Sequence, residues 1–375
     1  MRTLTIISHT EHYYDKEGKL VGLGATVMEI NQLLSIFDKI YHVAMLYKNP
    51  APASCLPYTS NAITFVPIPK VGGKKITDKL AIVGQMPAIL KRISKTLKHS
   101  DYFQFRAPTG IGVFVLPYLI YLYHGKGWFK YAGDWSAQQS PISYKFQNYL
   151  LKNQKRQVTI NGSWPNQKSN CITFENPCLT DQEIVSGHEI TAIKKWNEKA
   201  IELCFVGRLE ANKGLDLFLN ALALLSEETK QTIKKVHVVG GGTLLSNYKT
   251  WAEKLNITMT FYGVLSRNDV HEIYKKSHGI VLPSKSEGFP KVIAEALNYG
   301  CIPVVSDIYA IRDYITHEKN GFLITELSVH AVANVLNTFL KIDSVTYQKL
   351  IEARVQVVNK FSYNYYNEHL IQSVL

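Results

Sequence analysis

The second half of the chain alternates short apolar runs with amphipathic stretches, and this alternation limits the possible folds more than any other feature. The apolar runs have the length of strands and lie at 201–206, 235–239, 258–262, 279–282 and 302–306. The stretches between them have helical spacing, at 215–226, 244–255, 267–277 and 290–299. Strands that alternate with helices are typical of parallel sheets covered by helices on both faces. We therefore expect a doubly wound α/β domain with a parallel sheet.

The first half repeats this alternation less regularly. We expect strands at 4–8, 40–46, 102–106 and 128–132, and helices at 25–37, 77–98 and 142–152. Residues 176–199 are polar and lack an apolar strand, so they are the candidate linker. A chain of 375 residues exceeds a typical single domain. The sequence predicts one Rossmann-like domain at 1–180, another at 181–360, a cleft between them, and a segment at 361–375 that could pack back on the first.

Two glutamates, Glu287 and Glu295, flank a turn directly after the strand at 279–282. Open α/β sheets bind their ligands at the carboxyl ends of strands. If the segment were helical, the carboxylates would lie about 12 Å apart along the axis, at roughly 1.5 Å per residue. Paired glycosidase carboxylates are closer, within about 5 to 9.5 Å. The spacing suits two anchors on one extended ligand, with a sugar at one end, a ribose at the other and a diphosphate at the helix N-terminus between them. The alternative is a capped surface helix with two ordinary glutamates.

A second motif, at 207–214, joins the strand at 201–206 to the next helix and carries two cations, Arg208 and Lys213. An arginine fork and a lysine point charge at the carboxyl end of a strand suit a diphosphate. They could neutralise the charge that grows on a leaving nucleotide, which elsewhere is the role of a metal ion. The alternative is a solvated basic loop.

Four residues of the first half are weaker candidates. Gly22 and Gly24 precede a helix, where glycines let the backbone approach a phosphate or sugar, although a plain turn explains them as well. Asp134 follows a predicted strand and could contact sugar hydroxyls, act as a base or cap a helix. Arg106 ends another strand and could bind an acceptor phosphate, or be an ordinary exposed charge.

Composition narrows the possible partners. The formal net charge of +12 favours anionic partners, and because no nucleic-acid-binding signature accompanies it, we expect phosphorylated substrates or an anionic membrane surface and no nucleic acid. The apolar stretch at 111–123 is too short to span a bilayer, which takes about 20 residues, so it is either a buried helix or a segment that touches lipid. The N-terminus reads as a first strand, and five cysteines without a CxxC pair indicate a reducing compartment, so we expect a cytoplasmic protein. No His, Cys, Asp or Glu set has the spacing of a metal site, so we expect neither a metal ion nor another cofactor.

Together, the segment from Gly207-Arg208 to Lys213-Gly214 and the segment from Glu287-Gly288-Phe289-Pro290 to Glu295 resemble glycosyltransferase family 4. The resemblance is specific over about residues 200–310 and looser before them. It implies a retaining enzyme with the GT-B fold, whose first domain binds the acceptor and whose second binds a nucleotide-sugar.

The resemblance also assigns roles. Arg208 and Lys213 would hold the diphosphate, and Gly22 and Gly24 would approach it from the other side. Glu287 would contact the transferred sugar together with backbone N–H groups around Gly288, Phe289 and Pro290, and Glu295 would bind the ribose hydroxyls. The chain departs from the family where many members carry a histidine near the sugar and it has Gly133-Asp134. That departure bears on the identity of the sugar and on the role of Asp134. The family's retaining mechanism has no obvious nucleophile, so the resemblance implies that Glu287 positions the sugar and stabilises charge, and does not attack covalently.

These roles predict a hexosyltransferase that moves a sugar from a UDP- or GDP-sugar to a glycan or a polyprenyl-diphosphate-linked acceptor. Surface polysaccharide synthesis, of lipopolysaccharide or capsule, would fit the basic surface and a peripheral membrane location. Two alternatives stay open. One is a transferase that acts on a small soluble sugar, and the other is a non-catalytic scaffold that binds a sugar nucleotide.

Overall fold

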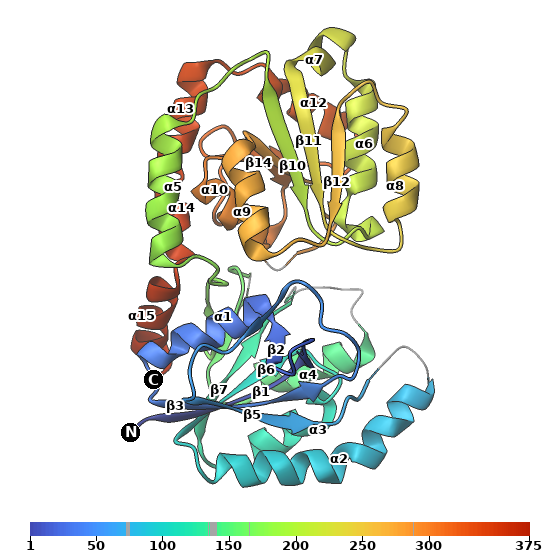
Figure 1. The fold of residues 1–375 in the computed structure, drawn as a ribbon. Helices are drawn as coiled ribbons and strands as arrows, with labels where there is room; N and C mark the ends of the chain where they lie inside the picture. The colour runs from blue at the N-terminus through green and yellow to red at the C-terminus, as the bar shows by residue number, and fades with distance from the viewer. Residues whose placement is uncertain (73–75, 134, 136–140, 165, 288) are drawn as a thin grey trace. The chain divides into compact units, whose positions relative to one another are not determined.

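The computed structural model describes residues 1–72, 76–133, 135, 141–164, 166–287 and 289–375, with the backbone alone at 76–81. The chain divides into two compact units (Figure 1). Unit 1 comprises Met1–Glu175 and Tyr366–Leu375, and unit 2 comprises Asn176–Tyr365. The division therefore falls a few residues before the expected boundary, and the last residues of the chain belong to unit 1.

Unit 1 is built on a parallel sheet in the order β5-β3-β1-β6-β7-β8-β9. These strands are β1 Thr3–Tyr14, β3 Lys39–Leu46, β5 Ile63–Ile68, β6 Tyr102–Ala107, β7 Lys126–Tyr131, β8 Val158–Ile160 and β9 Cys171–Thr173. Two short strands, β2 Leu20–Leu23 and β4 Cys55–Pro57, extend the sheet in antiparallel fashion beyond the far end of β1. β1 is longer than predicted because its second part pairs with β2.

Helices cover both faces of this sheet. They are α1 Gly24–Gln32, η1 Leu33–Ser35, α2 Ile76–Leu97, α3 Gly112–Pro117, the π-helical turn η2 Tyr118–Leu122, α4 Ile142–Lys152 and α15 Tyr363–Ser373. Successive side chains of a strand point to opposite faces. Leu4 and Ile6 of β1 accordingly pack in one core with Tyr366 and Leu370 of α15, whereas Ile7 packs in the other. The C-terminal helix thus contributes to a core of unit 1.

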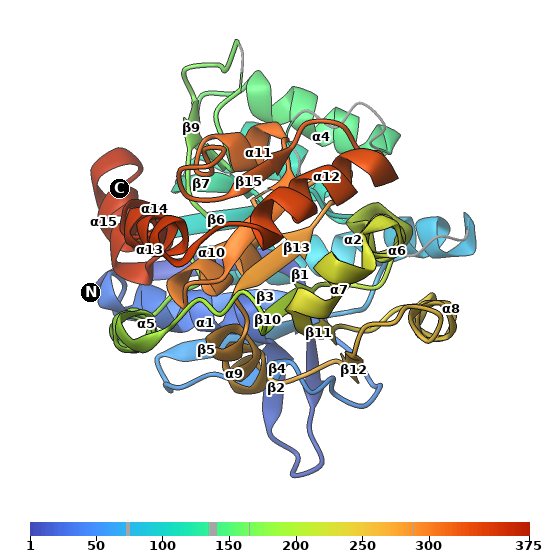
Figure 2. The same cartoon turned by 90° about the horizontal axis from the view of Figure 1, so that it is seen from above.

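Unit 2 is a doubly wound parallel sheet in the order β12-β11-β10-β13-β14-β15 (Figure 2). Its strands are β10 Ile201–Val206, β11 Ile233–Val239, β12 Met259–Gly263, β13 Gly279–Leu282, β14 Ile302–Ser306 and β15 Phe322–Ile324. Its helices are α5 Asp181–Ile193, η3 Ala211–Lys213, α6 Leu215–Leu224, α7 Glu227–Thr232, α8 Leu245–Ala252, α9 Arg267–Lys276, α10 Lys291–Asn298, α11 Tyr309–Arg312, α12 Val329–Leu340, α13 Ser344–Ala353 and α14 Val355–Lys360. The five strands expected in this half are confirmed, with bounds shifted by two residues at most.

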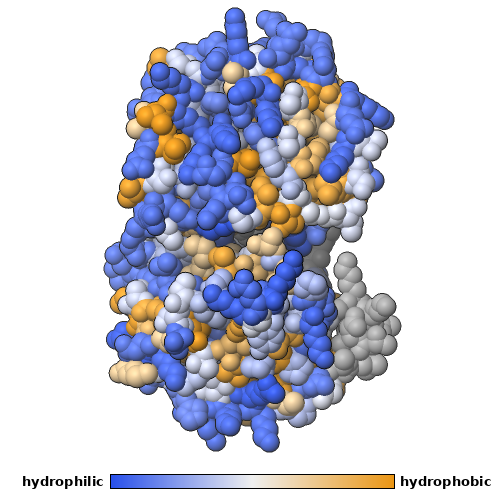
Figure 3. All heavy atoms as spheres, in the orientation of Figure 1, coloured by the Kyte–Doolittle hydropathy of each residue, from blue (hydrophilic) through white to orange (hydrophobic). Residues whose placement is uncertain are grey.

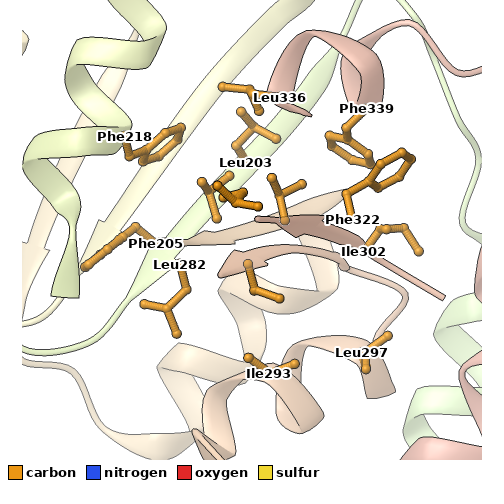
Figure 4. Close-up of a cluster of buried hydrophobic side chains, with 14 of the residues drawn as sticks. Leu203, Phe205, Phe218, Leu282, Ile293, Leu297, Ile302, Phe322, Leu336 and Phe339 are labelled. Carbon is orange, nitrogen blue, oxygen red and sulfur yellow. The ribbon is translucent and has the colours of Figure 1, made fainter. Parts of the chain in front are cut away.

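The core of unit 2 is layered around this sheet. In Figure 4, Phe218 of α6 and Phe339 of α12 lie on one side of the strands, and Ile293 and Leu297 of α10 lie on the other. All four side chains are fully buried. Because α10 is fixed by this packing, its N-cap residue Pro290 and the buried residues along it have a defined place beside the sheet.

One expectation about this half is wrong. Residues 176–199, taken as a linker, contain helix α5. Thr180 and Glu183 form a capping box, in which each side chain bonds the backbone N–H of the other residue. The apolar residues of α5 are few, so periodicity alone does not reveal it, whereas the capping pair was a visible signal.

The stretch at 111–123 is split between two environments. It forms α3 and η2, in which Leu119 is buried while Tyr121 and Leu122 are exposed. Of the helices that the structure describes, none combines the length and the apolar character needed to cross a bilayer. The face of the molecule drawn in Figure 3 is mostly hydrophilic, with small groups of apolar residues between.

Candidate functional site

Lys213 and Glu287 lie together at the carboxyl edge of the unit 2 sheet. Lys213 ends the loop that follows β10, and Glu287 lies in the loop that follows β13, the neighbouring strand. The Lys213 ammonium donates a hydrogen bond to the Glu287 carboxylate, and the two side chains are 16% and 9% exposed. The Lys285 N–H bonds the Asn212 carbonyl at 2.9 Å and joins the two loops. The two motifs predicted separately are therefore parts of one site.

Glycines allow these loops to approach so closely. Gly214 has a φ of +76°, and a Cβ there would lie 2.1 Å from the Pro283 carbonyl oxygen. Gly240 has a φ of +138°, and its Cβ would lie 1.8 Å from the Gly207 carbonyl oxygen. The glycines that follow β11 carry no phosphate-binding pattern in the sequence. Their role here is to let one backbone pack directly on another beside Arg208.

The remaining residues of the two motifs differ in whether their side chains or backbone groups can contact a ligand. The Arg208 side chain is 71% exposed and pairs at 3.1 Å with Glu210, so it is free to rearrange toward an anion. Phe289 is buried, stacked on Phe361 with centroids 4.3 Å apart, so only its backbone can contact a ligand. Pro290 is the N-cap of α10 and has no N–H to donate. The expectation that N–H groups up to Pro290 complete the sugar site is therefore wrong at that residue.

Glu295 is a buried residue of α10, and its carboxylate is held by an arginine that the sequence did not single out. Arg267 Nη1 donates to Glu295 Oε1 at 2.6 Å, while the Tyr274 hydroxyl lies 3.5 Å from Oε2. The same guanidinium grips Glu183 in a fork, with Nε to Oε1 at 2.9 Å and Nη2 to Oε2 at 3.0 Å. Burial opposes the charge of Arg267, but Glu295 and Glu183 outweigh it, and the pKa of Arg267 is raised. The arginine is thus a permanent cation between two carboxylates.

In unit 1, close packing accounts for both candidate glycines. A Cβ at Gly22 would lie 2.6 Å from Nε2 of His12, and one at Gly24 would lie 2.4 Å from the Ser54 carbonyl oxygen. The His12 ring is itself fixed by the Tyr58 hydroxyl, 2.7 Å from Nε2. Both glycines are therefore required by contacts within unit 1, and their approach to a phosphate stays a prediction.

Arg106 is a buried charge of unit 1. It lies at the end of β6 with a side chain 10% exposed, and its Nη2 donates to Glu29 of α1 at 2.9 Å. Lys130 of β7 bonds the same carboxylate oxygen at 2.6 Å, and its ammonium lies 4.8 Å from the centroid of the Tyr366 ring. The view of Arg106 as an exposed charge is wrong, because the residue is part of a buried ionic cluster in unit 1. Its predicted contact with an acceptor phosphate would require that cluster to open.

Asp134 and Gly288 lie outside the described residues, so their predicted roles stay predictions. Within the described ranges, no group of three His, Cys, Asp or Glu side chains is arranged to hold a metal ion. The five cysteines are free thiols, and four of them are buried.

Known proteins resemble this chain in both sequence and fold. In Campylobacter jejuni, GalNAc-alpha-(1->4)-GalNAc-alpha-(1->3)-diNAcBac-PP-undecaprenol alpha-1,4-N-acetyl-D-galactosaminyltransferase is 29% identical over 40% of this chain and 39% of its own length. In Escherichia coli, UDP-Gal:alpha-D-GlcNAc-diphosphoundecaprenol alpha-1,3-galactosyltransferase is 29% identical over 42% of this chain and 41% of its own. These matches span only about two fifths of each relative. The crystal structure of HepE from Anabaena, in complex with UDP and glucose, superposes with a TM-score of 0.73 at 14% identity, covering 100% of this chain and 99% of that one.

The structural likeness confirms the expected fold class, two Rossmann-like α/β units as in GT-B glycosyltransferases, while the cleft stays a prediction. The family described as glycosyl transferases group 1 matches residues 188–356. That stretch lies within unit 2 and contains both motifs, with Lys213, Glu287 and Glu295. Over residues 188–356, this chain is therefore similar to the glycosyl transferases group 1 family.

Proposed function

We propose that the chain is a retaining glycosyltransferase that moves a hexose from a UDP-sugar to a glycan or a polyprenyl-diphosphate-linked acceptor in surface polysaccharide synthesis. The observation that carries this proposal is the Lys213–Glu287 ion pair at the carboxyl ends of two adjacent parallel strands. A cation for a diphosphate and a carboxylate for a sugar lie there in contact. The relatives that act on undecaprenol-linked acceptors and the fold shared with UDP-binding structures support the choice of substrates.

The ion pair also suggests how the donor enters. An incoming diphosphate takes the place of the Glu287 carboxylate as the partner of Lys213, and the exposed Arg208 turns from Glu210 to the same phosphates. Glu287, released from Lys213, then faces the sugar that is joined to that diphosphate. The ion pair of the free protein thereby keeps both charges in place until the donor arrives.

In the reaction the bond between sugar C1 and the diphosphate oxygen breaks, and a bond from C1 to the acceptor oxygen forms on the same face. The acceptor's hydroxyl proton passes to the departing diphosphate. Lys213 and Arg208 stabilise the negative charge on the leaving group, and Glu287 stabilises positive charge on the sugar ring. We propose that these two cations make a metal ion unnecessary.

A panel of donors tests the proposal. UDP-, GDP- and ADP-sugars are added to the protein, thermal unfolding is followed, and UDP release is measured with lipid-linked and soluble acceptors. A UDP-sugar should raise the melting temperature, because a ligand at about 100 times its Kd stabilises the folded state by roughly 2.7 kcal/mol. No stabilisation by any nucleotide sugar would refute the enzyme reading. Binding without transfer to any acceptor would favour the scaffold, and transfer to soluble sugars alone would favour the small-sugar enzyme.

A membrane location is proposed from an exposed face of unit 1. Helix α4 buries Gln147, Leu150 and Leu151, whereas Ile142, Lys145, Phe146 and Tyr149 recur at helical spacing on its exposed side. Ile142 is 87% and Tyr149 65% exposed. Tyr121 and Leu122 of η2, the turn that follows the neighbouring α3, are exposed as well. Apolar and aromatic side chains beside lysines suit an anionic lipid surface, where a polyprenyl-linked acceptor would be found.

Vesicle sedimentation tests this location. The protein should sediment with phosphatidylglycerol vesicles more than with phosphatidylcholine vesicles, and I142S/Y149S should lower that binding several-fold. V345S removes a similarly exposed apolar side chain from α13 of unit 2 and should have no effect. Equal losses in the two variants, or equal binding to both lipids, would contradict the proposed surface.

A further inference from the structure

The Arg267 side chain makes more hydrogen bonds than a residue in the first turn of a polar surface helix needs. Ser266 caps α9 by accepting from the Asp269 N–H, which fixes the backbone at Arg267. Its guanidinium donates to Glu295, to both oxygens of Glu183 and to the Cys178 carbonyl. All three of its nitrogens are used. A planar fork bound in this way has one orientation, which a single lysine charge could not reproduce.

The anchor of this arginine is rigid as well. The Glu183 carboxylate accepts the Thr180 N–H at 2.8 Å as part of the capping box of α5. Helix α5 is locked to α10, the helix of Glu295, because the Asn298 side chain donates to the Glu183 carbonyl at 2.7 Å. Gly187 provides the close contact, since a Cβ there would lie 2.4 Å from Oδ1 of Asn298. Arg267 therefore connects Glu295 to a fixed support.

The charges leave Glu295 able to bind a ligand. One guanidinium faces two carboxylates, and the pKa of the neighbouring His271 is lowered by burial and by Arg267, so this imidazole adds no second positive charge near neutral pH. Arg267 holds Oε1 of Glu295, whereas Oε2 accepts from the Tyr274 hydroxyl at 3.5 Å. A carboxylate has about four lone-pair sites, so acceptor capacity remains on the side away from the arginine.

We infer that Arg267 is a positioning residue for nucleotide recognition: it fixes the Glu295 carboxylate in the orientation in which it accepts hydrogen bonds from the ribose hydroxyls of the donor. This inference rests on the proposed function, in which Glu295 binds ribose. Arg267 binds Oε1 of Glu295 and leaves Oε2, which has the Tyr274 hydroxyl at 3.5 Å, without a guanidinium partner and therefore with acceptor capacity for a ribose hydroxyl. Loss of the arginine should therefore harm ribose discrimination before it harms turnover.

Calorimetric titration of the full chain with UDP and with 2′-deoxy-UDP tests the inference. Wild type should bind UDP about tenfold more tightly, the difference expected for one hydrogen bond to a charged group. In R267M that ratio should fall below about threefold, close to the value in E295A, while kcat at saturating donor changes far less. R312M removes an arginine of unit 2 that pairs with Asp307 on the surface, and it should keep the wild-type ratio.

Each outcome has a distinct meaning. If R267M weakens both nucleotides equally and keeps the ratio, Arg267 only supports the fold, and the inference is overturned. If R267M does not fold, E183Q carries the test, because it leaves Arg267 and Glu295 in place but weakens the anchor; it should lower the ratio, and an unchanged ratio would overturn the inference. If wild type binds no UDP, the proposed function fails and the inference falls with it. If wild type binds UDP without discrimination, only the ribose role of Glu295 and the inference fail.

Discussion

Replacing Glu287 with Gln should tighten UDP binding while it abolishes most turnover. In the free protein the Lys213 ammonium is already bound to Glu287, and the two side chains are only 16% and 9% exposed. UDP must break that contact and gains nothing from Glu287, because UDP carries no sugar. The substitution therefore removes a competitor for the lysine.

The expected change in UDP affinity follows from how much the substitution weakens the contact between Lys213 and residue 287. A hydrogen bond to a charged group contributes about 1.5–3 kcal/mol, and the glutamine keeps such a bond to the lysine ammonium while it loses the carboxylate charge. With that charge taken to supply about half of the contact, roughly 0.75–1.5 kcal/mol, the UDP Kd should fall about four- to twelvefold. Turnover should fall about 10²- to 10³-fold, the usual loss when one preorganised group that stabilises transition-state charge is removed.

The assay is UDP titration by calorimetry combined with steady-state turnover, on wild type, E287Q, K213M and the double variant. If Glu287 acts on UDP only by holding Lys213, then E287Q should leave the Kd unchanged in the K213M background. E227Q, which removes the carboxylate of a surface pair with Lys230, is the matched control and should alter neither quantity. Weaker UDP binding by E287Q, or equal tightening in the K213M background, would show that the two charges do not compete as reasoned.

Three other outcomes are expected. E29Q should lower the free energy of unfolding of unit 1, measured by urea titration, by about 3–5 kcal/mol. The reason is that it removes the carboxylate shared by two buried cations, Arg106 and Lys130. A loss below about 1 kcal/mol would argue against a tightly coupled cluster. Burial lowers the pKa of His12 to about 4, below its unfolded value of about 6.5. Between these values the unfolded state binds a proton that the folded state does not. The contribution of His12 to the stability of unit 1 is therefore full above pH 6.5 and should decline as the pH falls toward 4. H12Q should flatten that decline in unfolding midpoints measured between pH 7.5 and 4.5, and an unchanged slope would exclude His12 as its source. Turnover should persist in excess EDTA, and loss of activity restored by Mg²⁺ would refute the metal-free proposal.

Much of unit 2 could be predicted because its signals are local. The strand at 279–282 is a short apolar run, and the helix after Pro290 is mostly apolar and buried from Ile293 onward, so both follow from the order of side chains along a short stretch of chain. The residues of the two motifs follow such strands, and the carboxyl ends of parallel strands share one edge of a sheet. Lys213 and Glu287 could therefore be assigned to one edge before any coordinates were known. Helix α5 was missed because its stability comes from a capping box and from packing against α10, and not from an apolar stripe.

Contacts between distant residues were decided by the tertiary structure alone. The strand order of the sheet places β10 directly beside β13. Because these two strands are neighbours, Lys213 and Glu287, which are 74 positions apart, are close enough to form an ion pair. Arg267 gave no signal, because its partners lie 28 and 84 positions away. Arg106 has the same chemistry whether exposed or buried, and only the placement of Glu29, 77 positions away, makes it an internal charge. Sequence by itself determined the elements and the chemical groups that they carry, because those depend on neighbouring residues. The tertiary structure decided which charged residues form pairs, because two distant residues interact only after folding has brought them together.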